Sequence, residues 1–221
     1  MVRHIVPKVH KGSHYLSRTF NPMRKTLAHH LTSKCERCGN ERLLTIFDSY
    51  SSSPSSICPS CLMESAVLTP LIRLIFLHLG VEEETVKQLL KDQLIRRCML
   101  SVVKGIASFG VRFPQSAGVP ITIVWNFTNR CNLNCLHCHQ DSSPMSTYPE
   151  LTTHQAFEVI DNVSNAGVAI LTFSGGEPLL RGDLFDAVER VTDRGMLCTI
   201  ASNGTLMTKE VAEKLSTAGI R

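Results

Sequence analysis

Residues 121–138 of this 221-residue chain are ITIVWNFTNRCNLNCLHC, an apolar run that leads into three cysteines. The β-branched and aromatic side chains over residues 121–127 predict a buried strand. Cys131, Cys135 and Cys138 follow at once, separated by three and two residues. Because α/β proteins place their chemistry at the carboxyl ends of their strands, this loop is the first candidate for a functional site.

Downstream of this loop, strand and helix patterns alternate. Thr152 and Gln155 form a capping box that predicts a helix to residue 166. Strands are then predicted over residues 168–173 and 196–202, and helices over 183–194 and from 208 to near 219. This order predicts an α/β fold with a parallel sheet and right-handed crossovers.

The length of this region indicates an incomplete barrel. An eight-unit βα barrel takes about 31 residues per unit, so residues 121–221 amount to about three units. Three parallel strands do not close a barrel. We therefore expect a partial parallel barrel, truncated after the third unit, with an open edge at the strand over residues 196–202.

Upstream of the strand, a helical region is predicted over residues 62–112. One helix is expected over 64–79, and a second starts near Glu82 and continues toward Gly110 with a break at Gly105. The segment FPQSAGVP, residues 113–120, predicts a linker and places the domain boundary there.

Composition excludes a disordered chain, since 43% of residues are hydrophobic and 19% charged. The most apolar stretch, residues 71–79, is short and carries Arg73 and His78, so no membrane span or membrane partner is expected. The N-terminus lacks the apolar core of a signal peptide, which predicts a cytoplasmic protein.

The net charge of +4 is unevenly distributed. Residues 1–34 hold seven Lys and Arg and no acidic residue, whereas residues 35–221 carry a net charge of −3. We expect residues 1–34 to form a poorly ordered basic tail, with a nucleic-acid contact as the alternative.

Nine cysteines in a chain without a secretory signal indicate metal or redox chemistry rather than disulfides. Four of them, Cys35, Cys38, Cys58 and Cys61, form a C-x2-C-x19-C-x2-C pattern. This spacing predicts a zinc-ribbon-like module over residues 35–61 with a structural zinc. Rubredoxin-like iron or another cluster is the alternative for these ligands.

The two isolated cysteines, Cys98 and Cys198, lie in apolar stretches and are interpreted as small core residues.

The residues of the cysteine triad alone leave four interpretations open. An iron–sulfur cluster with one open iron is favoured, because the flanking asparagines suit a loop that curls around a centre. The alternatives are a buried helical stripe, a dithiol of thioredoxin type at Cys135 and Cys138, and zinc held by three cysteines with His137 or His139.

Two further motifs accompany the triad. Ser174-Gly175-Gly176-Glu177-Pro178 follows the second predicted strand, and Ser202-Asn203-Gly204 follows the third. With the triad after the first strand, this arrangement resembles the radical S-adenosylmethionine (radical SAM) superfamily over about residues 120–221. The resemblance implies that Cys131, Cys135 and Cys138 hold a [4Fe-4S] cluster whose fourth iron binds S-adenosylmethionine (SAM). Reductive cleavage of SAM would then give a 5′-deoxyadenosyl radical that abstracts hydrogen from a substrate.

The resemblance also implies the residues that bind SAM. Gly175 and Gly176 match the motif whose backbone binds the methionyl ammonium, and Glu177 adds an acceptor. Ser202 and Asn203 match the third-strand motif that faces the cofactor. No catalytic side chain is assigned.

One position departs from the family pattern. His137 stands where an aromatic residue usually packs near the adenine, and His139 receives no role. The implied partners are a low-potential electron donor of ferredoxin or flavodoxin type and an unidentified peptide, tetrapyrrole or metabolite substrate.

A rival hypothesis is a nucleic-acid- or protein-binding module that uses the zinc ribbon and the basic tail, with an inactive, incomplete enzyme domain. It predicts salt-dependent binding to nucleic acid. Residues 1–34 offer only Tyr15 and Phe20 as stacking aromatics, which counts against it.

Overall fold

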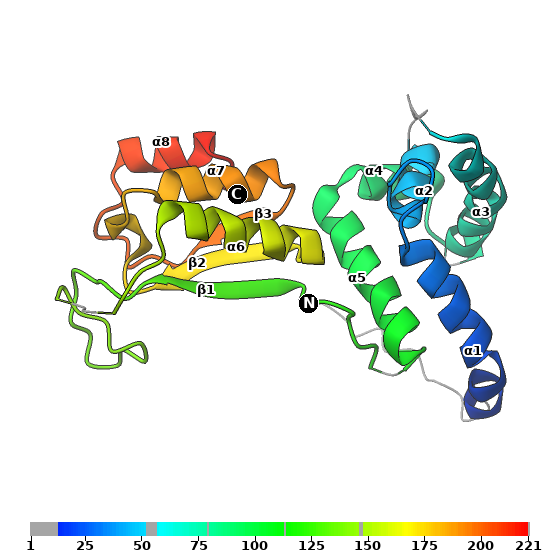
Figure 1. The fold of residues 1–221 in the computed structure, drawn as a ribbon, viewed down its shortest axis with the longest axis horizontal. Helices are drawn as coiled ribbons and strands as arrows, with labels where there is room; N and C mark the ends of the chain where they lie inside the picture. The colour runs from blue at the N-terminus through cyan, green and yellow to red at the C-terminus, as the bar shows by residue number, and fades with distance from the viewer. Residues whose placement is uncertain (1–12, 52–56, 79, 113, 146–147, 221) are drawn as a thin grey trace.

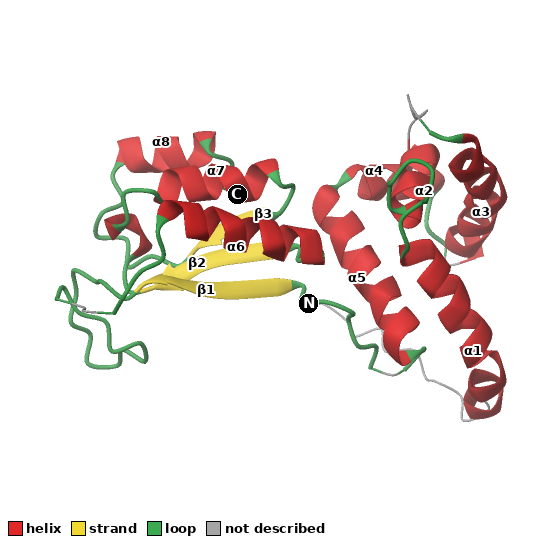
Figure 2. Ribbon diagram, in the orientation of Figure 1, coloured by secondary structure: helices red, strands yellow, loops and turns green. Residues whose placement is uncertain are grey.

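The computed structural model describes residues 13–51, 57–78, 80–112, 114–145 and 148–220. A helical unit precedes an α/β unit (Figures 1 and 2). The helical unit contains α1 (Ser13–Thr32), α2 (Arg42–Ser51), α3 (Pro59–His78), α4 (Glu83–Lys91) and α5 (Gln93–Phe109). The α/β unit contains β1 (Thr122–Thr128), α6 (Thr153–Ala166), β2 (Ile170–Gly175), the 3₁₀ helix η1 (Pro178–Leu180), α7 (Leu184–Asp193), β3 (Leu197–Ile200) and α8 (Lys209–Thr217).

The α/β unit confirms the predicted parallel sheet. Its three strands are in the order β1-β2-β3, and Trp125 lies opposite Phe173, which lies opposite Ile200. Helices α6, α7 and α8 all cover the same side of the sheet (Figure 2). In the described part of the chain β3 pairs with β2 alone, so it lies at an edge, as predicted.

Only one face of β1 is buried, whereas the sequence predicted a buried strand. Trp125 and Phe127 point toward the helices and pack against Phe173, with ring centroids 5.9 Å and 4.7 Å from it. Val124 points to the other face and is 63% exposed. On that same face the Thr172 and Thr199 hydroxyls lie 2.7 Å apart. The difference arises because the helices of the described residues cover one side of the sheet only.

The helical unit differs from the sequence prediction at two places. Within the expected disordered tail, residues 13–32 form α1; residues 1–12 lie outside the described residues. The second predicted helix breaks at Asp92 instead of Gly105, because the Asp92 side chain caps α5 by accepting from the N–H groups of Leu94 and Ile95. Gly105 continues the helix and packs against the backbone of Ser116.

The cysteine module is helical and not a ribbon. The chain between Cys38 and Cys58 contains α2, whereas a ribbon-like module was expected there; residues 52–56 lie outside the described residues. Leu43, Phe47 and other apolar side chains of α2 form the core of this unit with α4 and α5. This burial explains why the segment is helical.

Helix α3 is longer than the apolar stretch identified in the sequence. It runs over 20 residues, and its mean hydropathy of 1.6 makes it long and apolar enough to cross a membrane by length and composition. Only residues 71–79 of this apolar helix were identified from the sequence; that the chain has no membrane span stays a prediction.

The two units meet at the amino ends of the strands. The half-buried Arg97 guanidinium of α5 donates to the carbonyl oxygens of Val168 at 2.9 Å and Ser164 at 3.2 Å, and also to that of Arg194. The predicted linker packs on α5, where the Ser101 hydroxyl donates to the Val119 carbonyl at 2.8 Å. The cysteine triad lies at the far, carboxyl end of the sheet (Figure 1).

Candidate functional site

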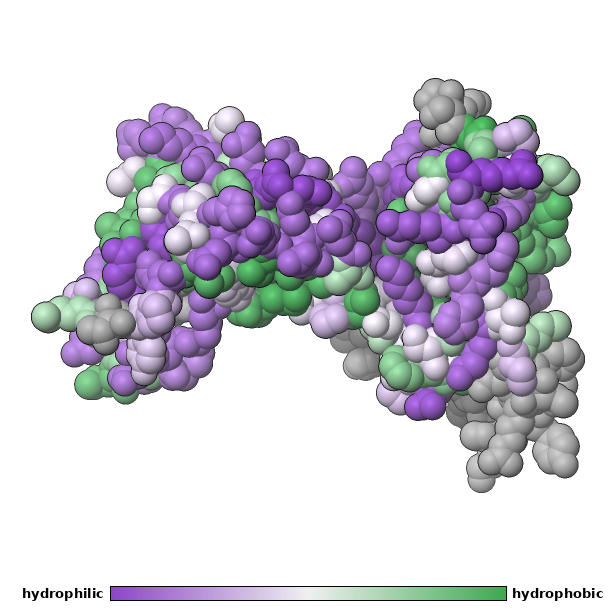
Figure 3. Space-filling model, viewed as in Figure 1, coloured by the Kyte–Doolittle hydropathy of each residue, from purple (hydrophilic) through white to green (hydrophobic). Residues whose placement is uncertain are grey.

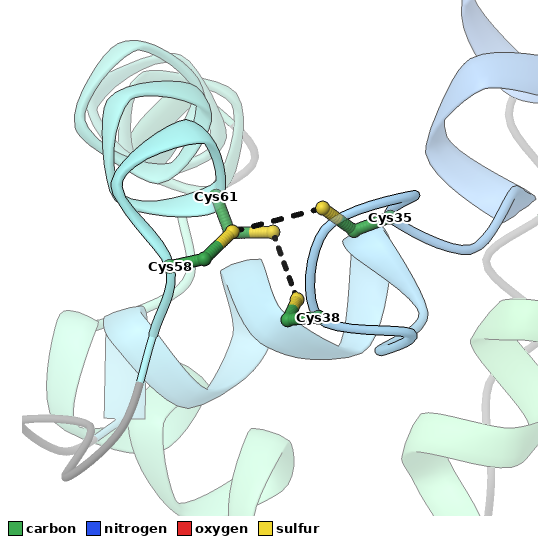
Figure 4. Close-up of side chains that lie close together, drawn as sticks. All are labelled: Cys35, Cys38, Cys58 and Cys61. Carbon is green, nitrogen blue, oxygen red and sulfur yellow. Dashed lines mark hydrogen bonds between the residues drawn. The ribbon is translucent and has the colours of Figure 1, made fainter.

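The four N-terminal cysteines come together at one point. Cys35 and Cys38 lie in the turn between α1 and α2, and Cys58 and Cys61 lie at the start of α3 (Figure 4). Their sulfur atoms all lie within 4.8 Å of one another. The Cys35–Cys58 and Cys38–Cys61 sulfur distances are both 3.7 Å. Four sulfurs at about 2.3 Å from one tetrahedral ion would be about 3.8 Å apart, so the arrangement fits a single metal ion.

Local backbone geometry prepares this site for thiolates. The N–H groups of Cys38 and Arg37 point at the Cys35 sulfur and lower the pKa of Cys35 to about 6. Burial raises the pKa of Cys61, which is 1% exposed. The neighbouring Arg42 guanidinium pairs with Glu64, and that contact and the nearby thiolates raise the pKa of Arg42.

The cysteine triad lies in the loop between β1 and α6. The Cys131 sulfur is buried and accepts the Leu133 N–H at 3.5 Å, whereas Cys135 and Cys138 are exposed. Backbone N–H groups of Ser142 and Gln140 lower the pKa of Cys138. In the described chain these three sulfurs do not converge as the N-terminal four do.

Hydrogen bonds join the loops that carry the three motifs. The Glu177 carboxylate is fully buried and accepts from the Ser202 hydroxyl at 3.0 Å and the Asn203 N–H at 2.8 Å. The Asn203 side-chain amide then donates to the Asn132 side chain at 2.9 Å and lies 3.7 Å from the Cys131 sulfur. The loops after β1, β2 and β3 therefore form one connected network.

The glycine motif is required by the packing of the first two loops. At Gly175, whose φ is +114°, an added Cβ would lie 2.1 Å from the Thr128 carbonyl oxygen. At Gly176 it would lie 2.1 Å from the Arg130 carbonyl oxygen. Both distances are far below contact, so only glycine allows the end of β2 to approach the start of the cysteine loop.

Sequence reasoning missed several residues of this region. The Thr205 hydroxyl accepts from the Asn132 side chain at 2.7 Å and completes the network. Arg181, which is 5% exposed, lies over the Phe127 ring at 3.8 Å and donates to the Leu151 carbonyl at 3.0 Å. Asn132 was interpreted only as a turn former, and nothing in the sequence pairs it with Thr205.

The histidines of the motif stay on the surface. His137 and His139 are both exposed, and His139 approaches the Gln140 side chain at 3.2 Å. The isolated Cys198 is fully buried, and burial raises its pKa to about 12, whereas Cys98 is only half-buried.

Comparisons with known proteins match the α/β unit. The radical SAM superfamily model matches residues 125–221. An AdoMet-dependent heme synthase of Methanosarcina barkeri (strain Fusaro / DSM 804) is 46% identical over 102 residues, which are 46% of this chain and 29% of that protein. The Fe-coproporphyrin III synthase of the same organism is 39% identical over 98 residues, 44% of this chain and 25% of that protein.

A crystal structure of BtrN in complex with AdoMet and 2-DOIA superposes with a TM-score of 0.42 at 24% identity, over 46% of this chain and 43% of that chain. The chain spans less than a third of the length of the two curated relatives above. The segment matched by the family model contains the triad, the glycine motif and the Ser202–Asn203 pair, one after each strand. The likeness to the radical SAM superfamily thus extends over residues 125–221 and includes all three motifs.

Proposed function

We propose that the chain is the SAM-cleaving part of a radical SAM enzyme, in which Cys131, Cys135 and Cys138 hold a [4Fe-4S] cluster. The network that ties the triad loop to the motifs after β2 and β3 carries this proposal. Three thiolates would leave one iron of a four-iron cluster open to bind a cofactor, which a closed four-ligand zinc site does not allow.

When bound, the cluster and SAM supply reductive cleavage of the sulfonium and hydrogen abstraction from a substrate. The residues of this chain would bind the cluster and SAM and orient them. The backbone N–H of Leu133 and the side-chain amide of Asn203 lie beside the Cys131 sulfur and would stabilise its thiolate form. The backbone at Gly175 and Gly176 would present strand-end carbonyls to the methionyl ammonium.

For Glu177 we propose a role that differs from the one that the family resemblance implied. Its carboxylate already accepts from Ser202, Asn203 and the Leu179 N–H, so it would hold the loop after β3 in place. Asn203 would then be positioned beside Cys131. His137 would stack on the adenine, because its side chain is exposed beside the triad.

The four-cysteine centre would hold a structural zinc ion. Its four ligands leave no open position, and it lies at the opposite end of the sheet from the triad (Figure 1). Iron in the same place would give a coloured, redox-active centre, which metal analysis distinguishes from zinc.

The substrate class follows only broadly from the relatives, whose names refer to haem and Fe-coproporphyrin. We propose a tetrapyrrole, peptide or metabolite substrate and a ferredoxin- or flavodoxin-type electron donor in the cytoplasm.

The test is SAM cleavage without substrate. Anaerobically reconstituted chain, reduced with dithionite, is expected to convert SAM to methionine and 5′-deoxyadenosine, and Cys135→Ala is expected to form neither. Cys98→Ala, at a half-buried cysteine outside both groups, is the matched control and should keep the wild-type rate. The proposal would be overturned if wild-type chain that carries its full iron formed neither methionine nor 5′-deoxyadenosine.

A further inference from the structure

The side of α3 that faces away from the helical unit is apolar. Met63 and Val67 are each 72% exposed and Leu77 is 70% exposed. The exposed residues of α3, leaving aside Pro59 at its first position, are Leu62, Met63, Ala66, Val67, Pro70, Leu71, Arg73, Leu74, Leu77 and His78. We call this set the outer face of α3; it appears as a hydrophobic strip along the right edge of Figure 3. Apolar strips of this extent mark interaction sites.

The side of α3 that faces inward carries several buried polar groups. The Ser65 and Thr69 hydroxyls and one Glu64 carboxylate oxygen are buried, and none has a hydrogen-bond partner among the described residues. A helix in a water-soluble protein normally turns its apolar side inward and its polar side outward. In α3 the inward side carries these polar groups beside Ile72 and Phe76, which pack on the core of the helical unit, while the outward side is mostly apolar. The outward side is therefore suited to an apolar environment outside the protein.

The charges around α3 indicate an anionic environment. The outer face has no acidic residue; its ionisable groups are His78 and Arg73, and Arg73 pairs with Glu83 of α4. Helix α1 contacts α3 through His30 and Glu64 at 3.3 Å. Helix α1 belongs to the stretch of 34 residues that has seven Lys and Arg and no acid, and it exposes Arg24 beside the apolar Met23 and Leu27.

We propose that the outer face of α3, with the basic side chains of α1, binds the surface of an anionic lipid bilayer. Apolar side chains would enter the interface while Lys and Arg meet the negative headgroups. This replaces the expectation from the sequence that the chain has no membrane partner. The proposal is independent of the radical chemistry at the other end of the sheet.

The helix lies along the bilayer and does not cross it. Cys61, in the first turn of α3, is one of the four converging thiols, and Glu64 pairs with Arg42 of α2. A spanning α3 would have to leave α2 and break the four-cysteine centre. A helix of 20 residues is about 30 Å long, so lying flat it presents its whole outer face to one leaflet.

The test is flotation of the metal-loaded 221-residue chain with lipid vesicles. Vesicles of phosphatidylcholine mixed with phosphatidylglycerol are expected to carry the wild-type chain to the top of the gradient, and vesicles of phosphatidylcholine alone to carry much less. Val67→Glu/Leu74→Glu should weaken binding to the mixed vesicles about tenfold or more, because two side chains leave the apolar interface. Val102→Glu, at an exposed valine of α5, should bind as the wild type does.

Retained zinc and an unchanged far-ultraviolet circular dichroism spectrum show that the variants are folded. The proposal would be overturned if the wild type and Val67→Glu/Leu74→Glu floated equally. It would also be overturned if the wild type did not float with the mixed vesicles. A dimer in lipid-free solution that Val67→Glu/Leu74→Glu converts to a monomer would assign the face to a second copy of the chain instead.

Discussion

At the scale of single residues, Glu177 gives a direct prediction about stability. Its buried carboxylate accepts from the Ser202 hydroxyl and from the N–H groups of Asn203 and Leu179. Glu177→Ala would leave these donors without partners in a buried place. We expect a loss of about 3 kcal/mol in the free energy of unfolding, measured by urea denaturation. Glu189→Ala, at an exposed glutamate of the same unit, should change it by less than about 0.5 kcal/mol.

A loss in Glu177→Ala no larger than in Glu189→Ala would show that the carboxylate does not hold the loops together. In that case Glu177 would be free to contact SAM, as the family resemblance implied.

The four N-terminal cysteines could be predicted as one site from sequence because their type and spacing are distinctive. Four cysteines at matched C-x2-C spacings predicted a site that the structure brings within 4.8 Å. The contacts of Asn132, Thr205 and Arg181 could not be found, because each joins segments that are distant in the chain. Such contacts depend on how the strands are placed side by side and leave no local pattern.

At the scale of elements, Asp161 joins α6 to α7. Its carboxylate accepts from Arg190 at 2.9 and 2.6 Å and from Arg194 at 2.6 Å, and the Arg190 guanidinium holds the pKa of Asp161 below its usual 3.8. A carboxyl group with a lowered pKa stabilises the folded state above its unfolded pKa, and that stabilisation disappears as the pH falls through the folded pKa.

We therefore expect Asp161→Asn to lower the free energy of unfolding by about 1 kcal/mol at pH 7. The difference between the variant and the wild type should shrink below about pH 4. Urea unfolding of both proteins at several pH values measures it. A difference that stays the same down to pH 3 would show that the ion pair is not its cause.

The elements of the α/β unit were predicted to within two residues or so, because caps and alternating patterns act locally. The capping box at Thr152 is formed as expected, and α6 ends at Gly167 in the left-handed conformation. The break at Asp92 was missed because Gly105, the more obvious breaker, is held in the helix by close packing on Ser116. The helical structure of α2 was missed because its apolar side becomes evident only against α4 and α5.

At the scale of the whole molecule, Arg97 connects the two units. It is half-buried at their contact and donates to carbonyl oxygens near the ends of α6 and α7, and partial burial lowers its pKa. Arg97→Ala would leave buried carbonyls unpaired and loosen the contact. We expect residues 111–121 to become several-fold more sensitive to limited proteolysis.

Arg96→Ala provides the control for that experiment, because Arg96 donates to Leu44 and pairs with Asp48 inside the helical unit. Its cleavage rate in residues 111–121 should stay near that of the wild type. Equal cleavage of Arg97→Ala and the wild type would mean that packing of the linker on α5 holds the units together without Arg97.

The order of the two units along the chain was predicted from sequence, because each has its own pattern of periodicity and cysteines. The contact between the two units was not predicted, because it is made by an arginine and by backbone carbonyls that no sequence pattern relates. The outward orientation of α3 was also missed, because its apolar residues are spread around the helix and the sequence does not show which side meets α2.

The central claim is that the chain holds two different metal centres, an iron–sulfur cluster at the triad and a zinc ion at the four N-terminal cysteines. Metal and sulfide analysis of anaerobically reconstituted wild type and Cys135→Ala tests it most directly. We predict about four irons, four sulfides and one zinc in the wild type, and the zinc alone in the variant. Iron that persists in Cys135→Ala, or zinc that is lost together with the iron, would contradict the account.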